Sequence, residues 1–228
     1  FLTRAHDQIR MASISNANLT FVGSHAGISI GEDGPSQMGL EDISMFRCLP
    51  NSLIFYPSDA VSTEKITELC SKIKGLKYIR ITRAKTPVVY SNDTAFEIGG
   101  FNVIKQSKKD KAVIVGAGIT LHEAVKAYDK LLKNGIKVAV VDCYCVKPFN
   151  SEKFLKLAQK SGKKVLVAED HYHEGGIGEM ITNALSDKGI NVMRLAVNGL
   201  PCSGKPEELM EKFRIDNKAI VKTIKDML

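Results

Sequence analysis

Apolar residues in the first third of the chain alternate between two spacings. Short continuous apolar runs suit strands, and they are separated by segments whose apolar positions recur with a helical period. Strands are predicted at residues 19–22, 53–56 and 78–82, with helices at 3–14, at 40–48 and after Ser58, which we expect to cap its helix. This alternation predicts an α/β unit in which the strand at 19–22 is buried.

The same alternation returns further along the chain. Strands are predicted at 112–115, 138–141, 165–168 and 192–195, with helices from about 121 to 132 and at 152–159, 177–185 and 207–213. Between the two units, residues 84–110 lack a helical period and carry Pro87 and a Gly99-Gly100 pair, which favours a linker. Strands separated by helices imply parallel pairing. We therefore predict two three-layer α/β units with mainly parallel sheets, at 1–84 and 111–228, joined by a linker at 85–110.

Composition narrows the possible partners. The 228 residues are 44% hydrophobic and 25% charged, with a formal net charge of +7. The densest basic group, Lys105, Lys108, Lys109 and Lys111, has no interleaved aromatic residues of the kind that stack on nucleic-acid bases. We therefore expect neither a nucleic-acid nor a membrane partner, and a basic field of this kind favours sugar phosphates.

The cysteines indicate the compartment. Five cysteines without a paired framework are typical of reduced thiols, so we expect a cytoplasmic protein. Cys143 and Cys145 share a strand face, but no second ligand pair has zinc-site spacing, so we interpret them as core residues and assign no metal ligands. The chain begins with Phe1 rather than Met, and we expect it to be a fragment.

A glycine-rich segment follows the first predicted strand. Residues 23–37 read GSHAGISIGEDGPSQ, with four glycines and a proline. Such a segment persists where the backbone must adopt unusual dihedral angles or approach a ligand. Ligands of open α/β sheets collect beyond the carboxyl ends of strands. We therefore expect His25 and Asp33 to face a shared substrate cavity.

This loop and the segments around it resemble the transketolase family. The likeness includes residues 1–11 (FLTRAHDQIRM), 56–59 (YPSD), 81–83 (ITR), 115–118 (VGAG) and 169–179 (EDHYHEGGIGE), and so extends over the whole chain. Gln37, where other branches have histidine, is similar to the animal-type branch. The resemblance implies part of a thiamine-diphosphate pyrimidine-binding domain followed by a transketolase-type C-terminal domain.

The resemblance also implies a reaction. Transketolases transfer a two-carbon ketol unit from a ketose phosphate to an aldose phosphate through thiamine diphosphate, in the pentose phosphate pathway. His25 matches the catalytic histidine that contacts the donor hydroxyl, and Asp33 matches the carboxylate that selects sugar stereochemistry. Arg83, in preference to Arg80, matches the arginine that binds substrate phosphate. Phe1 and Gln37 match cofactor-binding positions, Phe1 being the aromatic residue against the aminopyrimidine ring.

Part of the family's machinery is not in these residues. Transketolases hold the diphosphate and a divalent metal, Mg²⁺ or Ca²⁺, with an amino-terminal domain carrying a Gly-Asp-Gly motif, and an upstream glutamate activates the pyrimidine. We therefore expect the chain alone to be inactive and to belong to a homodimer whose active site is shared between subunits.

Other interpretations stay open at the level of sequence. The chain could be a truncated, noncatalytic paralogue that serves as an interaction module, or a subunit of a related deoxyxylulose synthase or oxo-acid dehydrogenase. Gly116-Ala117-Gly118 suggests a dinucleotide turn, but Leu121 stands where its third glycine would be. His171 and His173 have metal-pair spacing, and we favour an interface or structural role for them.

Overall fold

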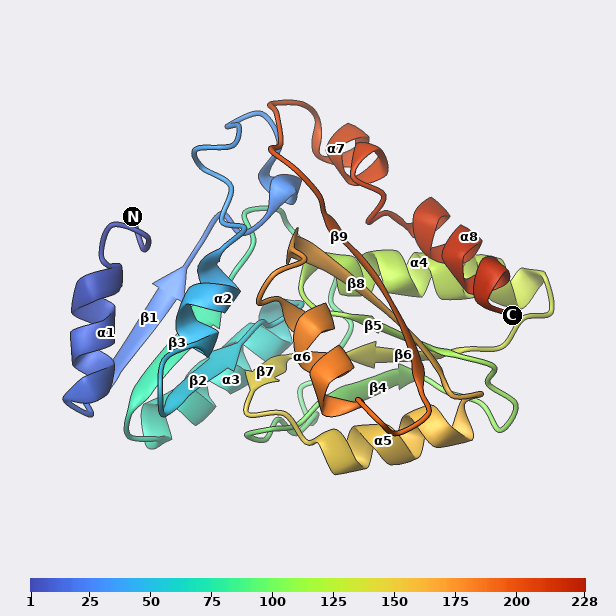
Figure 1. Ribbon diagram of the computed structural model, residues 1–228, viewed down its shortest axis with the longest axis horizontal. Coiled ribbons are helices and arrows are strands. Elements are labelled where there is room, and N and C mark those ends of the chain that lie inside the picture. The colour runs from blue at the N-terminus through green and yellow to red at the C-terminus, as the bar shows by residue number, and fades with distance from the viewer.

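The computed structural model describes residues 1–228 and consists of two α/β units side by side (Figure 1). The first half contains α1 (His6–Ile14), β1 (Leu19–Gly23), the 3₁₀ helix η1 (Ile28–Ile30), α2 (Asp42–Arg47), β2 (Ser52–Phe55), α3 (Ala60–Lys72), β3 (Leu76–Arg80) and β4 (Asn102–Lys105). The second contains β5 (Val113–Gly116), α4 (Ile119–Lys133), β6 (Ala139–Asp142), β7 (Cys145–Lys147), α5 (Ser151–Lys160), β8 (Lys164–Tyr172), α6 (Ile177–Ala184), β9 (Asn191–Val197), α7 (Pro206–Lys212) and α8 (Asn217–Met227).

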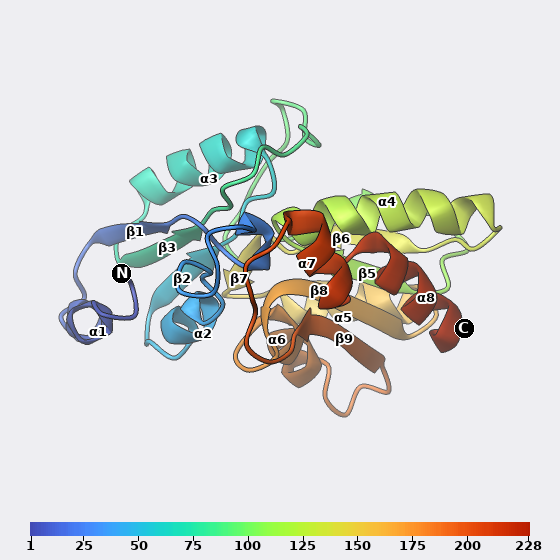
Figure 2. The same cartoon turned by 90° about the horizontal axis from the view of Figure 1, so that it is seen from above.

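The first sheet has the order β1-β3-β2-β7, in which β1, β3 and β2 are parallel and β7 is antiparallel to β2. Helix α3 covers one face, and α1 and α2 cover the other (Figure 2). Ile66 and Cys70 of α3 pack on one side, while Phe46 of α2 stacks on Tyr78 of β3 on the other, with ring centroids 4.1 Å apart. The predicted three-layer arrangement is confirmed for this unit.

Strand β1 differs from its prediction. It was expected to be buried, but Leu19 and Val22 are 45% and 57% exposed. The reason is its place in the sheet, because β1 pairs only with β3 and forms an edge. An apolar run alone does not distinguish a central strand from an edge strand.

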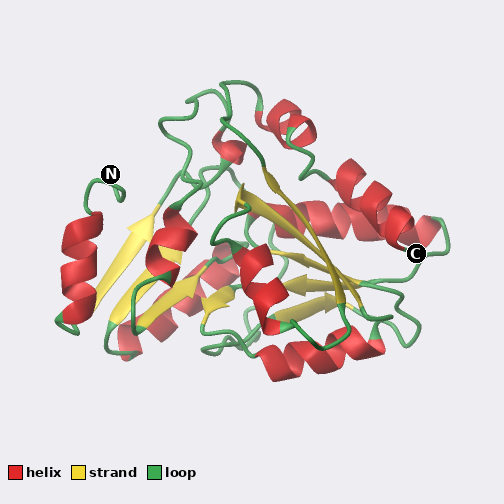
Figure 3. Ribbon diagram, viewed as in Figure 1, coloured by secondary structure: helices red, strands yellow, loops and turns green.

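The second sheet has the order β4-β6-β5-β8-β9, parallel except for β4. Helices α4 and α8 cover one face, and α5 and α6 cover the other (Figure 3). The strands β5 and β6 are buried on both faces, as expected for central strands between helical layers. The mainly parallel α/β fold is confirmed here too.

Two strands and one α-helix were not predicted. Residues 102–105, assigned to the linker, form β4 at the edge of the second sheet. Residues 145–147 form β7, which lies far along the chain yet completes the first sheet. Helix α8, whose amino terminus is capped by Asp216, was missed although its apolar residues Ile220, Ile224 and Met227 have helical spacing.

The start of α3 corrects a further detail. Asp59, not Ser58, is its N-cap: the Asp59 carboxylate accepts the Ser62 amide at 2.7 Å, and the Ser62 hydroxyl lies 2.9 Å from the Asp59 amide. Ser58 instead donates its hydroxyl to Asp142 of β6 at 2.8 Å. Ser58 therefore links the two units rather than starting a helix.

One hydrophobic cluster of 25 buried residues draws on both units, including Ile54 and Tyr78 from the first sheet and Val113 and Val167 from the second. The two sheets thus share a core in addition to the β2–β7 pairing. None of the helices combines the length and the apolar character that a membrane-spanning segment needs.

Candidate active site

The glycine-rich loop leaves β1 and folds back on itself. The Gly39 amide donates to the His25 carbonyl at 3.0 Å, and the Gly27 amide donates to the Gly39 carbonyl at 2.8 Å. His25 has a φ of 62°, an uncommon conformation for a residue with a side chain. The backbone therefore turns at His25 and is held there by Gly39 across the loop.

A cavity of about 540 Å³ lies beside this turn. Its walls include three predicted site residues, His25, Gln37 and Phe1, together with Phe21 and Tyr78. The full lining also includes Leu2, Thr3, Val22, Gly23, Ser24, Ala26, Pro35, Ser36, Met38, Gly39, Glu41, Asp42 and Met45. Three of the predicted site residues, distant in sequence, thus border one hollow.

His25 is held by a neighbour of the same loop. Its Nδ1 lies 2.9 Å from the Ser24 hydroxyl, which leaves Nε2 for a group in the cavity. A half-buried imidazole in this position can donate or accept one hydrogen bond to a bound hydroxyl. Phe1 is 99% exposed, so its ring borders the cavity without being fixed by packing.

Asp33 and Arg83 lie together but do not line this cavity. Arg83 Nη1 is 2.9 Å from Asp33 Oδ2 and 3.5 Å from the Ile30 carbonyl. Both side chains are exposed, at 50% for Arg83 and 36% for Asp33. The expectation that His25 and Asp33 share one cavity is therefore wrong for this structure, where Asp33 is instead the partner of Arg83.

A buried charge cluster that the sequence reasoning did not find forms part of the cavity wall, through Asp42 and Tyr78. Arg80 Nε donates to Asp42 Oδ2 at 2.7 Å, the Tyr78 hydroxyl donates to the same oxygen at 2.6 Å, and Asp42 Oδ1 is buried without a partner. Burial acts to raise the pKa of Asp42, but the charge and hydrogen bond of Arg80 outweigh it and hold the pKa below its usual range. The alternation of Tyr78 and Arg80 along β3 was the only sequence signal for this cluster.

Of the two histidines at 171 and 173, His171 lies beside this cluster. His171 is buried and its Nδ1 is 2.8 Å from the Tyr172 carbonyl, while His173 is half-buried. Burial, followed by the nearby Arg80 charge, lowers the pKa of His171 to about 4. A buried histidine with a backbone partner fits the structural role that we favoured.

The Gly116–Gly118 turn packs against the first unit. The Gly118 amide donates to the Ser58 hydroxyl at 2.8 Å, and a Cβ on Gly118 would lie 2.1 Å from the Tyr56 ring. The space beside this turn, which a dinucleotide would need, is filled by protein. The glycines serve domain packing in this structure.

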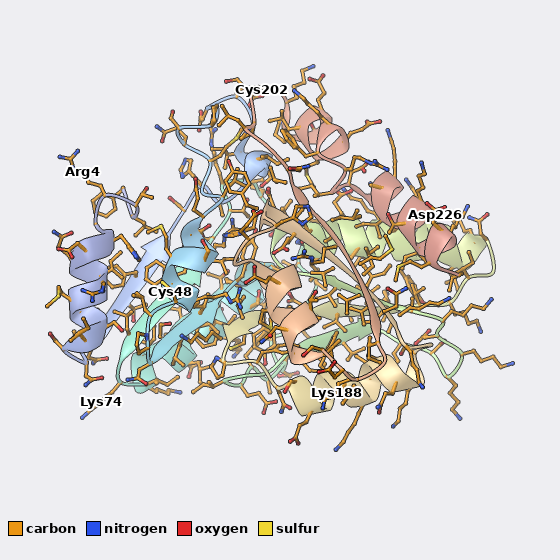
Figure 4. The ribbon with its side chains drawn as sticks, in the orientation of Figure 1. Arg4, Cys48, Lys74, Lys188, Cys202 and Asp226 are labelled. Atoms are coloured by element: carbon orange, nitrogen blue, oxygen red, sulfur yellow. The ribbon has the colours of Figure 1, made fainter.

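The thiols occupy two environments. Cys143 and Cys145 are buried, and the Cys145 sulfur accepts the Gly99 amide at 3.2 Å. Burial raises the pKa of Cys145 to about 12. Cys48 follows α2 and Cys202 lies before α7, both exposed (Figure 4).

Two family models match the chain, one for each unit. "Transketolase, pyrimidine binding domain" matches residues 1–89, and "Transketolase, C-terminal domain" matches residues 101–220. The chain belongs to the transketolase family. Its resemblance to that family, first read from the loop and the 169–179 segment, is confirmed.

Curated transketolase relatives align with the whole chain. It is 51% identical to Transketolase-like protein 1 of Bos taurus and 47% identical to Transketolase of Homo sapiens. The chain covers only 38% and 37% of these two proteins, respectively.

Solved transketolase structures share the fold. A structure described as "Split gene transketolase, inactive beta4 tetramer" superposes with a TM-score of 0.87 at 32% identity, over 98% of this chain and 71% of that one. Transketolase from Campylobacter jejuni gives a TM-score of 0.81 over 99% of this chain and 34% of its own, and at 24% identity this likeness concerns the fold alone.

Proposed function

We propose that the chain is the carboxyl-terminal part of a thiamine-diphosphate-dependent transketolase, which transfers a two-carbon ketol unit between sugar phosphates. The observation that carries the proposal is His25, which the folded-back glycine loop presents to a cavity lined by aromatic and amide side chains. Family membership supports the same reaction class.

The cavity suits the aminopyrimidine part of thiamine diphosphate. A flat heteroaromatic ring needs apolar walls and a few polar partners at its edge. Phe1 and Phe21 offer aromatic surface, Gln37 offers an amide, and the unpartnered Asp42 Oδ1 offers a buried acceptor. Phe1 and Gln37 are the residues that would hold the cofactor from this chain.

The chain's own residues bind and orient the sugar. The cofactor, when bound, supplies the electron sink for breaking and forming the carbon–carbon bond. His25 Nε2 forms a hydrogen bond with a hydroxyl group of the donor sugar. Arg83 binds phosphate, for which its planar set of donors is suited, and Asp33 orients that guanidinium while accepting a sugar hydroxyl.

The remainder of the assembly is also part of the proposal. A divalent metal, Mg²⁺ or Ca²⁺, and the diphosphate would be held by residues outside this chain, in a cytoplasmic homodimer of the pentose phosphate pathway with a shared active site. The chain alone would be inactive. The inactive tetramer of the split-gene relative, whose chain this one matches over 71% of its length, supports that expectation.

A hybrid enzyme tests the proposal. The chain would replace the matching carboxyl-terminal 37% of the human transketolase, and ketol transfer from xylulose phosphate to ribose phosphate would be measured with the intact human enzyme as control. We expect transfer by the hybrid and a loss of at least about 100-fold in kcat/KM in His25→Ala, as is usual when a hydrogen-bonding group at the reacting centre is removed.

A second candidate is a noncatalytic interaction module, and the inactive assembly of the split-gene relative favours considering it. A dimeric hybrid that binds thiamine diphosphate but transfers no ketol unit would establish this alternative and overturn the first. Turnover of pyruvate instead of xylulose phosphate would point to the deoxyxylulose synthase or oxo-acid dehydrogenase class.

A further inference from the structure

Strand β8 carries two consecutive buried carboxyl groups, each of which accepts two backbone amides. Glu169 accepts the Ile177 and Gly178 amides, at 2.5 and 3.0 Å, where α6 begins. Asp170 accepts the amides of Ile28 and Ser29, at 2.7 and 3.2 Å, in the glycine loop of the other unit. Consecutive strand residues face opposite sides, so one strand can anchor two separate segments.

The loop is shaped around the Asp170 side chain. A Cβ on Gly27 would lie 2.1 Å from the Asp170 carboxyl carbon, and Gly27 has a φ of 77°. Glycine is therefore required there both for its backbone conformation and for the close approach of the carboxylate. Asp170 itself is fully buried.

Arg80 extends this anchor to His25. Its Nη2 donates to the Asp170 carbonyl at 2.9 Å and to the Gly39 carbonyl at 2.8 Å. Gly39 in turn pairs with the backbone of His25 and Gly27. A continuous set of hydrogen bonds thus runs from β8 to the residue that borders the cavity.

The outer part of the loop also rests on the second unit. It runs beside the segment that precedes α7 (Figure 1), where a Cβ on Gly34 would meet the Ser203 hydroxyl at 2.6 Å. Ile28 and Ile30 pack in one buried cluster with Leu209 of α7. The second unit therefore supports the loop in addition to the loop's own backbone hydrogen bonds.

We propose that Asp170 is a positioning residue: its carboxylate fixes residues 26–29 and thereby sets the orientation of His25 toward the cavity. The C-terminal unit then contributes to the reaction by shaping the loop, without touching substrate. The link to catalysis rests on the proposed function, whereas the positioning of His25 does not.

Hydrogen exchange in the unsubstituted chain tests the contact without any variant. The Ile28 and Ser29 amides are expected to exchange at least about 100-fold more slowly than those of exposed Glu32 and Ser36, because exchange needs the hydrogen bond to open. Equal rates in the two pairs would overturn the inference.

Asp170→Asn keeps the shape of the side chain but turns an NH₂ group toward one of the two amides. Glu169→Gln makes the same change one residue earlier, at α6, and is the matched control. In Asp170→Asn we expect exchange at Ile28 and Ser29 to accelerate at least about 10-fold and the His25 ring resonance to shift, with neither change in Glu169→Gln. An unmoved His25 resonance in Asp170→Asn would contradict the positioning role.

The hybrid enzyme tests the consequence for catalysis. Asp170→Asn is expected to lower kcat/KM for the donor about 10-fold or more in the parent hybrid but less than about 2-fold in the His25→Ala background, because both changes affect the same interaction. Equal losses of kcat/KM in both backgrounds would contradict the inference. An inactive parent hybrid would instead count against the proposed function, while the exchange and resonance measurements would still decide the positioning role.

Discussion

Arg80 and Arg83 stand three positions apart yet occupy opposite environments. The Arg80 side chain is fully buried and pairs with Asp42, whereas half of the Arg83 side chain is exposed beside Asp33. Sequence spacing could not separate them, and the family resemblance favoured Arg83 for phosphate. The structure assigns Arg80 a different task, the support of Asp42, Gly39 and Asp170.

This contrast gives a paired prediction for unfolding in urea. Arg80→Ala should lower the free energy of unfolding by about 3–5 kcal/mol, because it leaves a buried carboxylate unpaired. Arg83→Ala should change it by less than about 1 kcal/mol, since exposed ion pairs contribute little. Equal losses for the two variants would contradict a buried ion pair between Arg80 and Asp42.

His171 predicts how stability depends on pH. Burial lowers its pKa to about 4 in the fold, so the unfolded chain takes up a proton first as pH falls below about 6.5. The stability contributed by neutral His171 is complete above that value and is lost as pH falls toward 4. Between pH 7 and 5 the loss should be about 2 kcal/mol of unfolding free energy.

The measurement compares urea unfolding of the parent and His171→Gln at both pH values. Burial raises the pKa of Asp142 to about 7 and that of Glu169 to about 8, and these groups stabilise the fold as pH falls. Only the difference between parent and variant therefore isolates His171. A variant with the same pH dependence as the parent would contradict this assignment.

At the scale of elements, caps decide how helices join their surroundings. Asp59 caps α3 with one carboxylate oxygen and accepts the Val89 and Tyr90 amides with the other, at 2.7 and 3.0 Å. It therefore ties the start of the helix to the segment that leads out of the first unit. Asp216 caps α8 through the Ala219 amide alone.

The two caps form a matched pair of variants. Asp216→Ala should lower the free energy of unfolding by about 1 kcal/mol, the usual value of an N-cap. Asp59→Ala should cost about 3 kcal/mol, because the Val89 and Tyr90 amides also lose their acceptor. Chemical denaturation of both variants measures the difference, and similar losses would mean that water replaces the second pair of bonds.

At the scale of the whole molecule, the two units are bound together in several ways. Strand β7 completes the first sheet from within the second unit, the Ser58 hydroxyl reaches Asp142, and the 25-residue core cluster crosses the boundary. The Asp170 contact with the glycine loop belongs to the same interface. We therefore expect the two units to unfold as one cooperative body.

Hydrogen exchange followed by mass spectrometry tests this cooperativity. Peptides covering β2 (Ser52–Phe55) and β5 (Val113–Gly116) should report opening free energies within about 1 kcal/mol of each other, because both strands contribute to the shared core. An opening free energy for β2 that lies more than about 2 kcal/mol below that of β5 would mean that the two units unfold separately.

Much of the architecture could be predicted from the sequence. Local periodicity predicted most helices and strands, because each must turn one apolar face toward a core, and alternation of the two predicted parallel sheets. The glycines of residues 23–37 indicated an irregular loop beyond a strand, and His25, Gln37 and Phe1 were nominated from it and from the family resemblance. Strand β7 escaped because three residues hold too little pattern to show that they complete another unit's sheet.

What only the tertiary structure decided are the contacts between residues far apart in sequence. Asp170 meets Ile28 across 142 positions and Arg80 meets Asp42 across 38, and no periodicity links such partners. A buried carboxylate needs donors wherever the fold can bring them, so its partners follow from packing and not from spacing. The sequence thus determined the elements and the chemical groups of the loop, while the fold determined that Asp33 pairs with Arg83 and that the second unit holds His25 in place.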